Sequence, residues 1–379
     1  MVFPDYDRSI LSIISSVMRY YGADCAYPTL PEIDEMLKTQ PKHVMLLVLD
    51  GLGDVELAKA LPENAYLRRN ISARVTSVFP STTTAATTAY ATGLSPLEHG
   101  WLAWMLYMKE YATDVVTFMQ NTHHTRKPVD GPYPAAHLMP YETAFEKIRT
   151  VNENVRTHSI YPFPSYSERG AHAVWHASDF SQFCTFLKRI ASVDEPSFTH
   201  AYWTQPDAAM HDFGVGSPEA LAHYKEINRL LEMTREKLPD TLLIISSDHG
   251  LVNAAEQIDL AQDADLMDTL VMPFMMESRA AAFYVKPHRK ADFERIFREK
   301  YGDDFLLMSR EEVYSSGIFG RGTPHRKFDD FIGDYIACAT GTKVFNYSLP
   351  GQKMRKMAGY HAGLTEAEMR VAVILDRTE

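Results

Sequence analysis

Cysteine, long apolar runs and basic charge are all scarce in this sequence. The 379 residues include only three cysteines, Cys25, Cys184 and Cys338, and no two of them form a CxxC pair. This scarcity excludes a disulfide framework and predicts free, buried thiols in a reducing compartment. No apolar run reaches the length of about 18 residues that a membrane-spanning helix needs. The formal net charge of -11 argues against binding to a nucleic-acid polymer.

The N-terminus also lacks the features of a secretory signal. Asp5 and Asp7 stand where a signal peptide would carry Lys or Arg. The apolar stretch "SILSIISSVM" is short and interrupted by serines, so we interpret it as an amphipathic helix that ends near Gly22. We therefore expect a cytoplasmic protein with no membrane association. The sequence leaves its oligomeric state open.

Apolar runs that end in an acid recur along the chain. "HVMLLVLD" ends at Asp50, "SFTHAYWTQPD" ends at Asp207, and "DTLLIISSDHG" carries Asp248 near its end. Continuous apolar runs of this length are typical of parallel strands buried on both faces. Helical patterns at 54–69 and 217–237 alternate with them. This alternation predicts an α/β fold with a mostly parallel central sheet sandwiched between helices.

The region 265–345 breaks this alternation. It holds a strand pattern, "AAAFYVK", a helix pattern, "KADFERIFREKYG", and much loop. We interpret it as a smaller inserted lid that packs over the site and shapes substrate choice. The predicted organisation is an N-terminal helical extension at 1–40, a core at 41–264, the lid at 265–345 and completion of the core at 346–379.

Three histidines accompany the strand-end acids. His211 follows Asp207 by four residues, so both lie on one face of a helical turn. His249 is adjacent to Asp248, and His361 lies in "GYHAGLT" before the last strand. A single strand-end Asp usually caps the next helix. The joint set of three Asp and three His instead favours two divalent metal ions, zinc first and manganese as an alternative, at the carboxyl edge of the sheet.

The stretch "SVFPSTTTAATTAYATGLSPLEHG", residues 77–100, is rich in hydroxyl groups. Thr is β-branched and a poor helix former, yet the alanines and Gly93 predict a helix here. A hydroxyl at the N-terminus of such a helix would lie where free N–H groups favour phosphate. The pattern alone does not choose among Thr82, Thr83 and Thr84.

The ordered set of motifs resembles a known group. Asp50-Gly51, "TGLSPLEHG", "DAAMHD", "SDHG" and "GYHAGLT" together resemble the alkaline phosphatase superfamily, and within it the type I phosphodiesterase/nucleotide pyrophosphatase family. The resemblance implies one metal held by Asp207, His211 and His361. It implies a second metal held by Asp50, Asp248 and His249.

The same resemblance places the nucleophile, which is also a metal ligand, at Thr83, with Thr82 and Thr84 as the neighbouring alternatives. The sequence departs from the family at one position. Nucleotide pyrophosphatases carry a phosphoryl-binding asparagine downstream of the nucleophile, and here Trp104 aligns with it. The indole N–H of Trp104 donates one hydrogen bond at most, so the departure leaves nucleotide specificity open.

We therefore expect a metal-dependent phosphodiesterase or nucleotide pyrophosphatase that acts on a small phosphate ester or nucleotide through a threonine phosphoenzyme. An alkaline phosphatase-like monoesterase, a phosphonoacetate hydrolase and a non-catalytic binding protein are the alternatives. "STTTAATTAYATG" and "QPDAAMHDFG" contain no arginine, which favours a singly charged diester. Within the predicted lid, Arg279 and "GRGTPHRK" at 320–327 are the candidates for binding a substrate anion.

Overall fold

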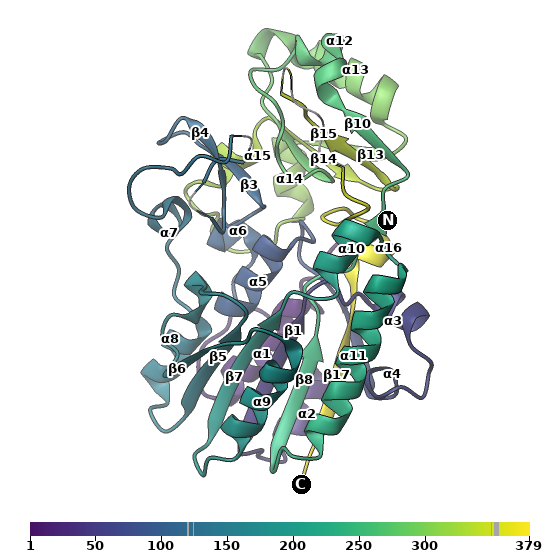
Figure 1. Cartoon of the computed structure of the whole chain (residues 1–379). Coiled ribbons are helices and arrows are strands. Elements are labelled where there is room, and N and C mark those ends of the chain that lie inside the picture. Colours follow the sequence, from purple (N-terminus) through teal and green to yellow (C-terminus); the bar gives the residue numbers. More distant parts are fainter. Residues whose placement is uncertain (120, 124, 350, 352–355) are drawn as a thin grey trace.

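The computed structural model describes residues 1–119, 121–123, 125–349, 351 and 356–379, and it has two lobes (Figure 1). The larger lobe is built on a central sheet with the strand order β2–β17–β8–β1–β7–β5–β6. Its strands are β1 (His43–Leu49), β2 (Ile71–Thr76), β5 (Arg156–Tyr161), β6 (Ala173–His176), β7 (Ser197–Trp203), β8 (Thr241–Ser246) and β17 (Arg370–Arg377).

The central sheet is mostly parallel, as the sequence predicts. β8, β1, β7, β5 and β6 run parallel, and β17 is antiparallel to both of its neighbours, β8 and β2. Every residue of β1, β7 and β8 is buried, which explains their unbroken apolar sequences. Because Val48 of β1 is in register with Tyr202 of β7 and Ser246 of β8, the three strands end at the same edge.

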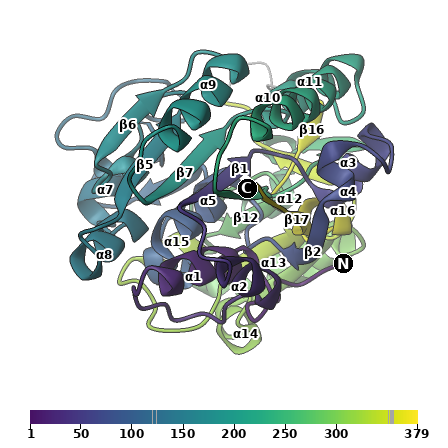
Figure 2. The same ribbon diagram turned by 90° about the horizontal axis from the view of Figure 1, so that it is seen from below.

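Helices cover both faces of this sheet, so the predicted α/β sandwich is confirmed (Figure 2). One face packs against α1 (Ile10–Tyr20), α2 (Pro31–Leu37), α5 (Thr83–Thr92) and α8 (Ala144–Val151). The other packs against α3 (Asp54–Ala60), α4 (Tyr66–Arg69), α9 (Phe180–Ala191), α10 (Asp207–Phe213) and α11 (Pro218–Arg235). The single helix expected over 54–69 is two helices, because the chain leaves α3 at Leu61 and turns through Pro62.

The smaller lobe is built on an antiparallel sheet with the strand order β13–β14–β12–β11–β3–β4. Its strands are β3 (Met105–Met108), β4 (Thr113–Val116), β11 (Met275–Met276), β12 (Ala280–Phe283), β13 (Phe305–Ser309) and β14 (Tyr335–Ala339). β3 and β4 belong to the stretch expected in the core, so residues 265–345 alone do not make this sheet. These strands are short and carry little alternation, which is why the sequence did not reveal them.

The remaining elements are short or cover the antiparallel sheet of the smaller lobe. The helices of that lobe are α12 (Ala264–Met267), α13 (Lys290–Tyr301), α14 (Arg310–Ser316) and α15 (Phe328–Ile332). Two further strand pairs are β10 (Glu256–Asp259) with β15 (Lys343–Asn346) and β9 (Val252–Asn253) with β16 (Gly359–Tyr360). Single turns are α6 (Pro96–His99), α7 (Pro134–Leu138), α16 (Glu366–Met369), η1 (Tyr166–Glu168), η2 (Leu260–Gln262) and η3 (Pro287–Arg289).

In the described part of the chain, no helix combines the length and the apolar character needed to cross a membrane.

Candidate functional site

The carboxyl edge of the central sheet gathers the predicted acids. Asp50 directly follows β1, Asp248 and His249 lie beyond the end of β8, and Asp207 opens α10 after β7. The backbone ties these ends together, because the Asp50 N–H donates to the Trp203 carbonyl and the Asp207 N–H donates to the Asp50 carbonyl. Gly51 is required between them: its φ is +73°, and a Cβ there would lie 2.8 Å from the Cα of Asp207.

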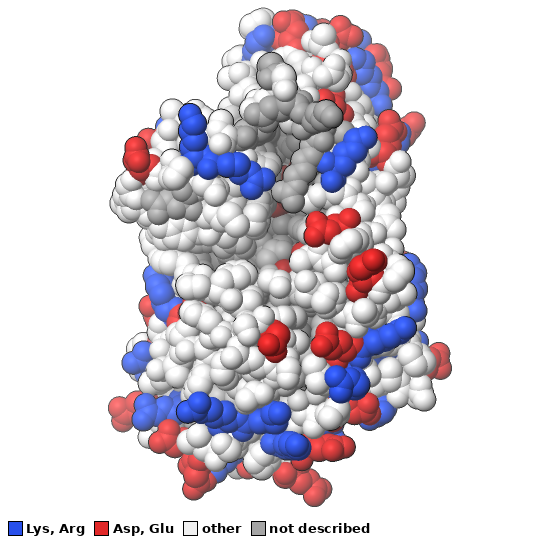
Figure 3. All heavy atoms as spheres, viewed as in Figure 1, with Lys and Arg blue, Asp and Glu red and all other residues white. Residues whose placement is uncertain are grey.

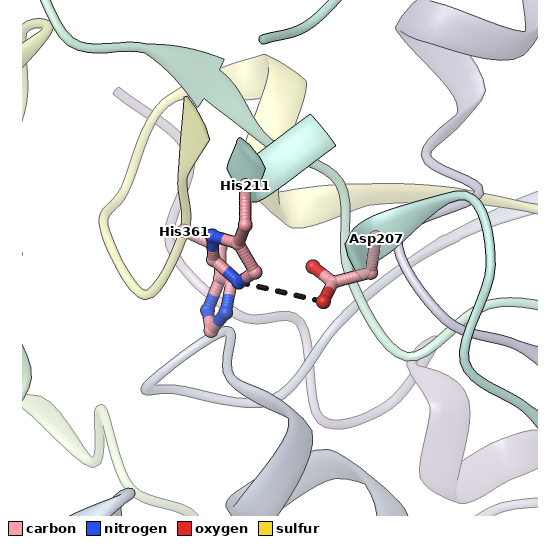
Figure 4. A group of neighbouring side chains, drawn as sticks. All are labelled: Asp207, His211 and His361. Carbon is pink, nitrogen blue, oxygen red and sulfur yellow. Dashed lines mark ion pairs between the residues drawn. The ribbon is translucent and has the colours of Figure 1, made fainter. Parts of the chain in front are cut away.

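The structure brings the six predicted Asp and His ligands together in two groups. Asp207, His211 and His361 form one, and Asp50, Asp248 and His249 form the other, with the potential ligand atoms of each within 4.8 Å of one another. In the first group, Nε2 of His211 lies 3.4 Å from Oδ2 of Asp207 (Figure 4). The two groups are contiguous, since the rings of His249 and His361 stack with their centroids 4.0 Å apart.

Unpartnered polar atoms in these groups fit divalent cations. Four side-chain atoms are buried and have no hydrogen-bond partner among the described residues: Oδ1 of Asp50, Oδ1 of Asp207, Oδ2 of Asp248 and Nδ1 of His361. Buried polar atoms are rarely left unpaired, because desolvation without a partner costs free energy. Oxygen and nitrogen ligands in this combination suit zinc or manganese. Four such atoms in two adjoining groups fit two cation sites.

Two histidines are oriented by backbone carbonyls. Nδ1 of His211 lies 2.8 Å from the Gly359 carbonyl oxygen, and Nδ1 of His249 lies 3.2 Å from that of Gly250. A carbonyl can only accept, so Nδ1 carries the proton in both rings. In the neutral form of each ring the free lone pair is then on Nε2, the arrangement that metal-binding histidines usually have.

The electrostatics of the ligand set favour a cation. Burial raises the pKa of Asp50 well above its usual value, and the neighbouring Asp248 and Asp207 raise it further. Burial also raises the pKa of Asp207. The pKa of His361 is lowered by burial and then by His249 and His211. Close carboxylates repel one another when ionised, and bound cations relieve that repulsion.

Among the threonines, Thr83 is the one whose hydroxyl faces the ligands. Its Oγ1 lies 3.3 Å from Oδ2 of Asp50 and 3.2 Å from Nε2 of His249. Thr83 is the first residue of α5, where backbone N–H groups are free. Oγ1 of Thr82 donates to Glu277, and Oγ1 of Thr84 is buried without a partner.

The other threonines of α5 stabilise the helix locally. The hydroxyls of Thr87, Thr88 and Thr92 each donate to the backbone carbonyl four residues earlier. Such bonds satisfy hydroxyl groups inside a buried helix. The hydroxyl-rich sequence therefore combines one threonine that faces the ligands with several that pack.

The site opens into a cavity of about 1010 Å³ between the two lobes, where Figure 3 shows the surface hollowed. Asp50, Thr83, Asp207, His211 and His361 lie in its wall. Aromatic side chains form much of the remainder: Trp104, Phe118, Tyr133, Tyr161, Phe163, Tyr166, Tyr202, Phe274, Tyr347 and Tyr360. The segment 265–345 contributes Phe274, Met276, Glu277 and Ser278 to this wall. A cavity of this size and lining accommodates a bulky apolar or aromatic substituent.

Trp104, the candidate for a hydrogen bond to substrate through its indole N–H, lies in this wall and is 36% exposed, and its role in binding stays a prediction. Its backbone N–H donates to Oε1 of Glu277 over 2.6 Å. The backbone of Trp104 is thus held by a carboxylate.

Arg279 does not fit the predicted role in binding substrate. Its side chain is fully buried and does not line the cavity. Nε and Nη2 donate to the two carboxylate oxygens of Glu368, and the remaining donors reach the carbonyls of Lys343 and Gly341. The sequence shows that Arg279 is basic but not that Glu368 neutralises it.

The segment 320–327 also lies away from the described wall of the cavity. His325 packs against Gly100, and Lys327 pairs with Glu110 and Asp330. Among the described residues that line the cavity, Arg126 is the only Lys or Arg.

Two polar residues of the site were not predicted from the sequence. Tyr202, on β7, donates its hydroxyl to Oδ2 of Asp50. Glu277, after β11, accepts from Oγ1 of Thr82 over 2.8 Å and from the N–H of Trp104. The one sequence signal for Glu277 is an acid directly after the apolar residues "FMM". Tyr202 gives no signal, because an aromatic residue in a buried strand usually only packs.

Comparisons with known proteins agree with this geometry. Murine ectonucleotide pyrophosphatase/phosphodiesterase 5 has a similar fold, with a TM-score of 0.63 and 16% identity over 87% of each chain. Phosphonoacetate hydrolase from Sinorhizobium meliloti 1021, solved with phosphonoformate, has a TM-score of 0.64 and 17% identity over 89% of this chain and 91% of that one. At such identities the likeness shows the fold. No curated protein matches the chain.

The family model described as type I phosphodiesterase/nucleotide pyrophosphatase matches residues 44–360, a span that runs from β1 to the residue before His361. The chain therefore belongs to the type I phosphodiesterase/nucleotide pyrophosphatase family.

Proposed function

We propose that this chain is a metal-dependent phosphodiesterase that uses Thr83 as its nucleophile. The observation that carries the proposal is the position of the Thr83 hydroxyl. It lies at the N-terminus of α5, within hydrogen-bond range of Asp50 and His249, and it faces the cavity. A half-buried hydroxyl that contacts a carboxylate and a histidine has the surroundings that an activated nucleophile needs.

The ligand sets define what a bound metal contributes. We propose Asp207, His211 and His361 for one ion, and Asp50, Asp248, His249 and the Thr83 oxygen for the other. Two divalent cations, zinc or alternatively manganese, would lower the pKa of the Thr83 hydroxyl and offset negative charge on the phosphoryl oxygens.

The chain's own residues account for the bond changes. Oγ1 of Thr83 attacks phosphorus in line with the leaving oxygen, so a threonine–phosphorus bond forms as the ester bond breaks. The departing alkoxide takes up, through solvent, the proton that the Thr83 hydroxyl gives up. Water then cleaves the phosphothreonine, which releases the second product and restores the hydroxyl. Free N–H groups at the start of α5 stabilise the phosphoryl oxygens.

The cavity supports a diester as substrate. A diester carries a second organic group, and the aromatic wall provides an apolar surface to hold it. A murine relative with a similar fold was solved as an inactive threonine-to-alanine variant in complex with AMP. That complex supports a small nucleotide or nucleotide-like ester as one class of substrate to test here.

A substrate panel tests the proposal. Enzyme saturated with zinc is assayed with bis-p-nitrophenyl phosphate, p-nitrophenyl phosphate, a p-nitrophenyl nucleotide ester and phosphonoacetate. We expect a higher kcat/KM for the diesters than for the monoester, and we expect Thr83→Ala to lose diester turnover. Preference for p-nitrophenyl phosphate would indicate a monoesterase, and turnover of phosphonoacetate alone would indicate a phosphonate hydrolase. No turnover of any compound would contradict an enzymatic function on these esters.

A further inference from the structure

Glu277 joins three parts of the molecule beside the Thr83 hydroxyl. It directly follows β11, whose Met276 pairs with Met105 of β3. Its Oε1 accepts from Oγ1 of Thr82, the N-cap residue of α5, and from the N–H of Trp104. The carboxylate is thus fixed next to the helix terminus at which Thr83 lies.

The second oxygen of Glu277 is not engaged by the protein. Both hydrogen bonds go to Oε1, and Oε2 makes none with any described residue. Oε2 is not fully buried. Glu277 lines the same cavity as Asp50 and Thr83. Burial raises the pKa of Glu277, whereas the hydrogen bonds from the Trp104 N–H and the Thr82 hydroxyl, and then His249 and His211, act in the opposite direction and favour the ionised carboxylate. Its charge therefore acts on the space that a phosphoryl group would occupy.

The Glu277 carboxylate changes the net charge that a substrate would meet in the site. Two divalent ions would bring four positive charges, and Asp50, Asp207 and Asp248 offset three of them. With Thr83 as a neutral hydroxyl, Glu277 offsets the fourth, so no excess positive charge remains. A phosphodiester brings one negative charge to such a site, whereas a monoester dianion brings two. The second charge has no cation to meet it and lies near a carboxylate.

We propose that Glu277 is a specificity-determining residue that discriminates against doubly charged phosphoryl groups and so favours diesters over monoesters. This inference rests on the proposed function. It assigns the discrimination against the second negative charge to one carboxylate, in addition to the apolar surface that the aromatic wall offers to the second organic group of a diester.

Arg126 does not compensate for Glu277. It lines the cavity from the segment after β4, and its side chain is exposed. No hydrogen bond or ion pair connects Arg126 with Thr82, Thr83 or Glu277 in the described part of the chain. A cation on an exposed segment is screened by solvent and salt, whereas Glu277 is held by two hydrogen bonds at the helix terminus.

The test compares Glu277→Gln with the parent enzyme. Gln keeps an oxygen that accepts from Thr82 and Trp104, so the charge is removed while the local contacts remain. For bis-p-nitrophenyl phosphate and p-nitrophenyl phosphate, we expect the ratio of kcat/KM to shift about tenfold toward the monoester, which corresponds to about 1.4 kcal/mol. Glu277→Asp, which keeps the charge, should retain the diester preference. Glu63→Gln removes a charge from the exposed turn after α3 and should leave the ratio unchanged.

A binding measurement separates charge from turnover. Calorimetric titration of the zinc-saturated proteins with inorganic phosphate should give a Kd about tenfold lower for Glu277→Gln, while the Kd for diphenyl phosphate changes less than threefold. An unchanged ester ratio together with an unchanged phosphate Kd would overturn the role of Glu277 and leave the phosphodiesterase intact. Equal loss of both activities would assign Glu277 a structural role only. A parent enzyme that hydrolyses neither ester would overturn the proposed function itself.

Discussion

Tyr202→Phe isolates one hydrogen bond at the proposed metal site. The hydroxyl of Tyr202 donates to Oδ2 of Asp50, and the side chain is 4% exposed. Without that hydroxyl, Oδ2 keeps only the contact with Oγ1 of Thr83. The ring of Tyr202 still fills its space, so the substitution removes a donor and creates almost no cavity.

The expected magnitude follows from the charge on the acceptor. A hydrogen bond to a charged group contributes about 1.5–3 kcal/mol. Loss of a partner that orients a metal ligand usually lowers metal affinity by about 10–100-fold. That range corresponds to about 1.4–2.8 kcal/mol, so the two estimates agree. We therefore expect Tyr202→Phe to weaken binding of the ion held by Asp50, Asp248 and His249 by about 10–100-fold.

Tyr161→Phe provides a matched control. Tyr161 is 3% exposed, and its ring centroid lies 5.3 Å from that of Tyr202. Its hydroxyl is buried and makes no hydrogen bond with any described residue. Removing an unpaired buried hydroxyl is neutral or stabilising, so metal affinity should not change.

Zinc affinity of the two variants and the parent is measured by competition with a chromogenic chelator, which resolves the two binding steps. One step should weaken in Tyr202→Phe and neither in Tyr161→Phe. Unchanged zinc binding in Tyr202→Phe would refute the assignment of Asp50 as a ligand oriented by Tyr202. An equal loss in both variants would trace the effect to packing of the aromatic pair.

Three further outcomes are expected. Thr83→Ala should lower diester turnover on the order of 10³-fold or more while both metals still bind. Thr84→Ala should keep a turnover near that of the parent. Loss of turnover in Thr84→Ala but not in Thr83→Ala would identify Thr84 as the nucleophile. Arg279→Met leaves Glu368 buried without its partner, so the free energy of unfolding in urea should fall by about 3–5 kcal/mol while KM stays unchanged. An altered KM at unchanged stability would instead support a role of Arg279 in substrate binding. Burial lowers the pKa of His99 to about 3, so the folded state binds a proton less readily than the unfolded chain, and stability falls as pH decreases below about 6.5. His99→Gln keeps a donor for the Ala85 carbonyl and an acceptor for the Trp101 N–H but cannot titrate; its Tm should fall less steeply between pH 6.5 and 4, and an identical slope would exclude this contribution.

The sequence predicted the parts of the site that depend on local pattern. Continuous apolar runs identify β1, β7 and β8, and parallel strands must end at one edge, so the proximity of Asp50, Asp207 and Asp248 followed. His361 is different: only the ordered motifs connected it with acids more than a hundred positions earlier in the chain. Its place beside His211 and His249 is now visible, and its role as a ligand stays a prediction.

The parts that the sequence missed depend on partners far away along the chain. Arg279 was interpreted as a substrate-binding cation, because the sequence does not show that Glu368, 89 positions later, takes up its charge. Glu277 reaches Thr82 across 195 positions, and Tyr202 reaches Asp50 across 152. Such hydrogen bonds join segments that are distant in the chain, either the neighbouring strands β1 and β7 of the central sheet or parts of the two lobes, and periodicity in one segment does not reveal them.

The most direct test of a two-metal phosphodiesterase is a stoichiometric activation. The protein is stripped with chelator, and hydrolysis of bis-p-nitrophenyl phosphate is followed as zinc is added in known equivalents. The ligand sets predict that turnover is absent without metal and rises until two equivalents per chain are bound. Full turnover by the stripped protein, or saturation at a single equivalent, would contradict the account.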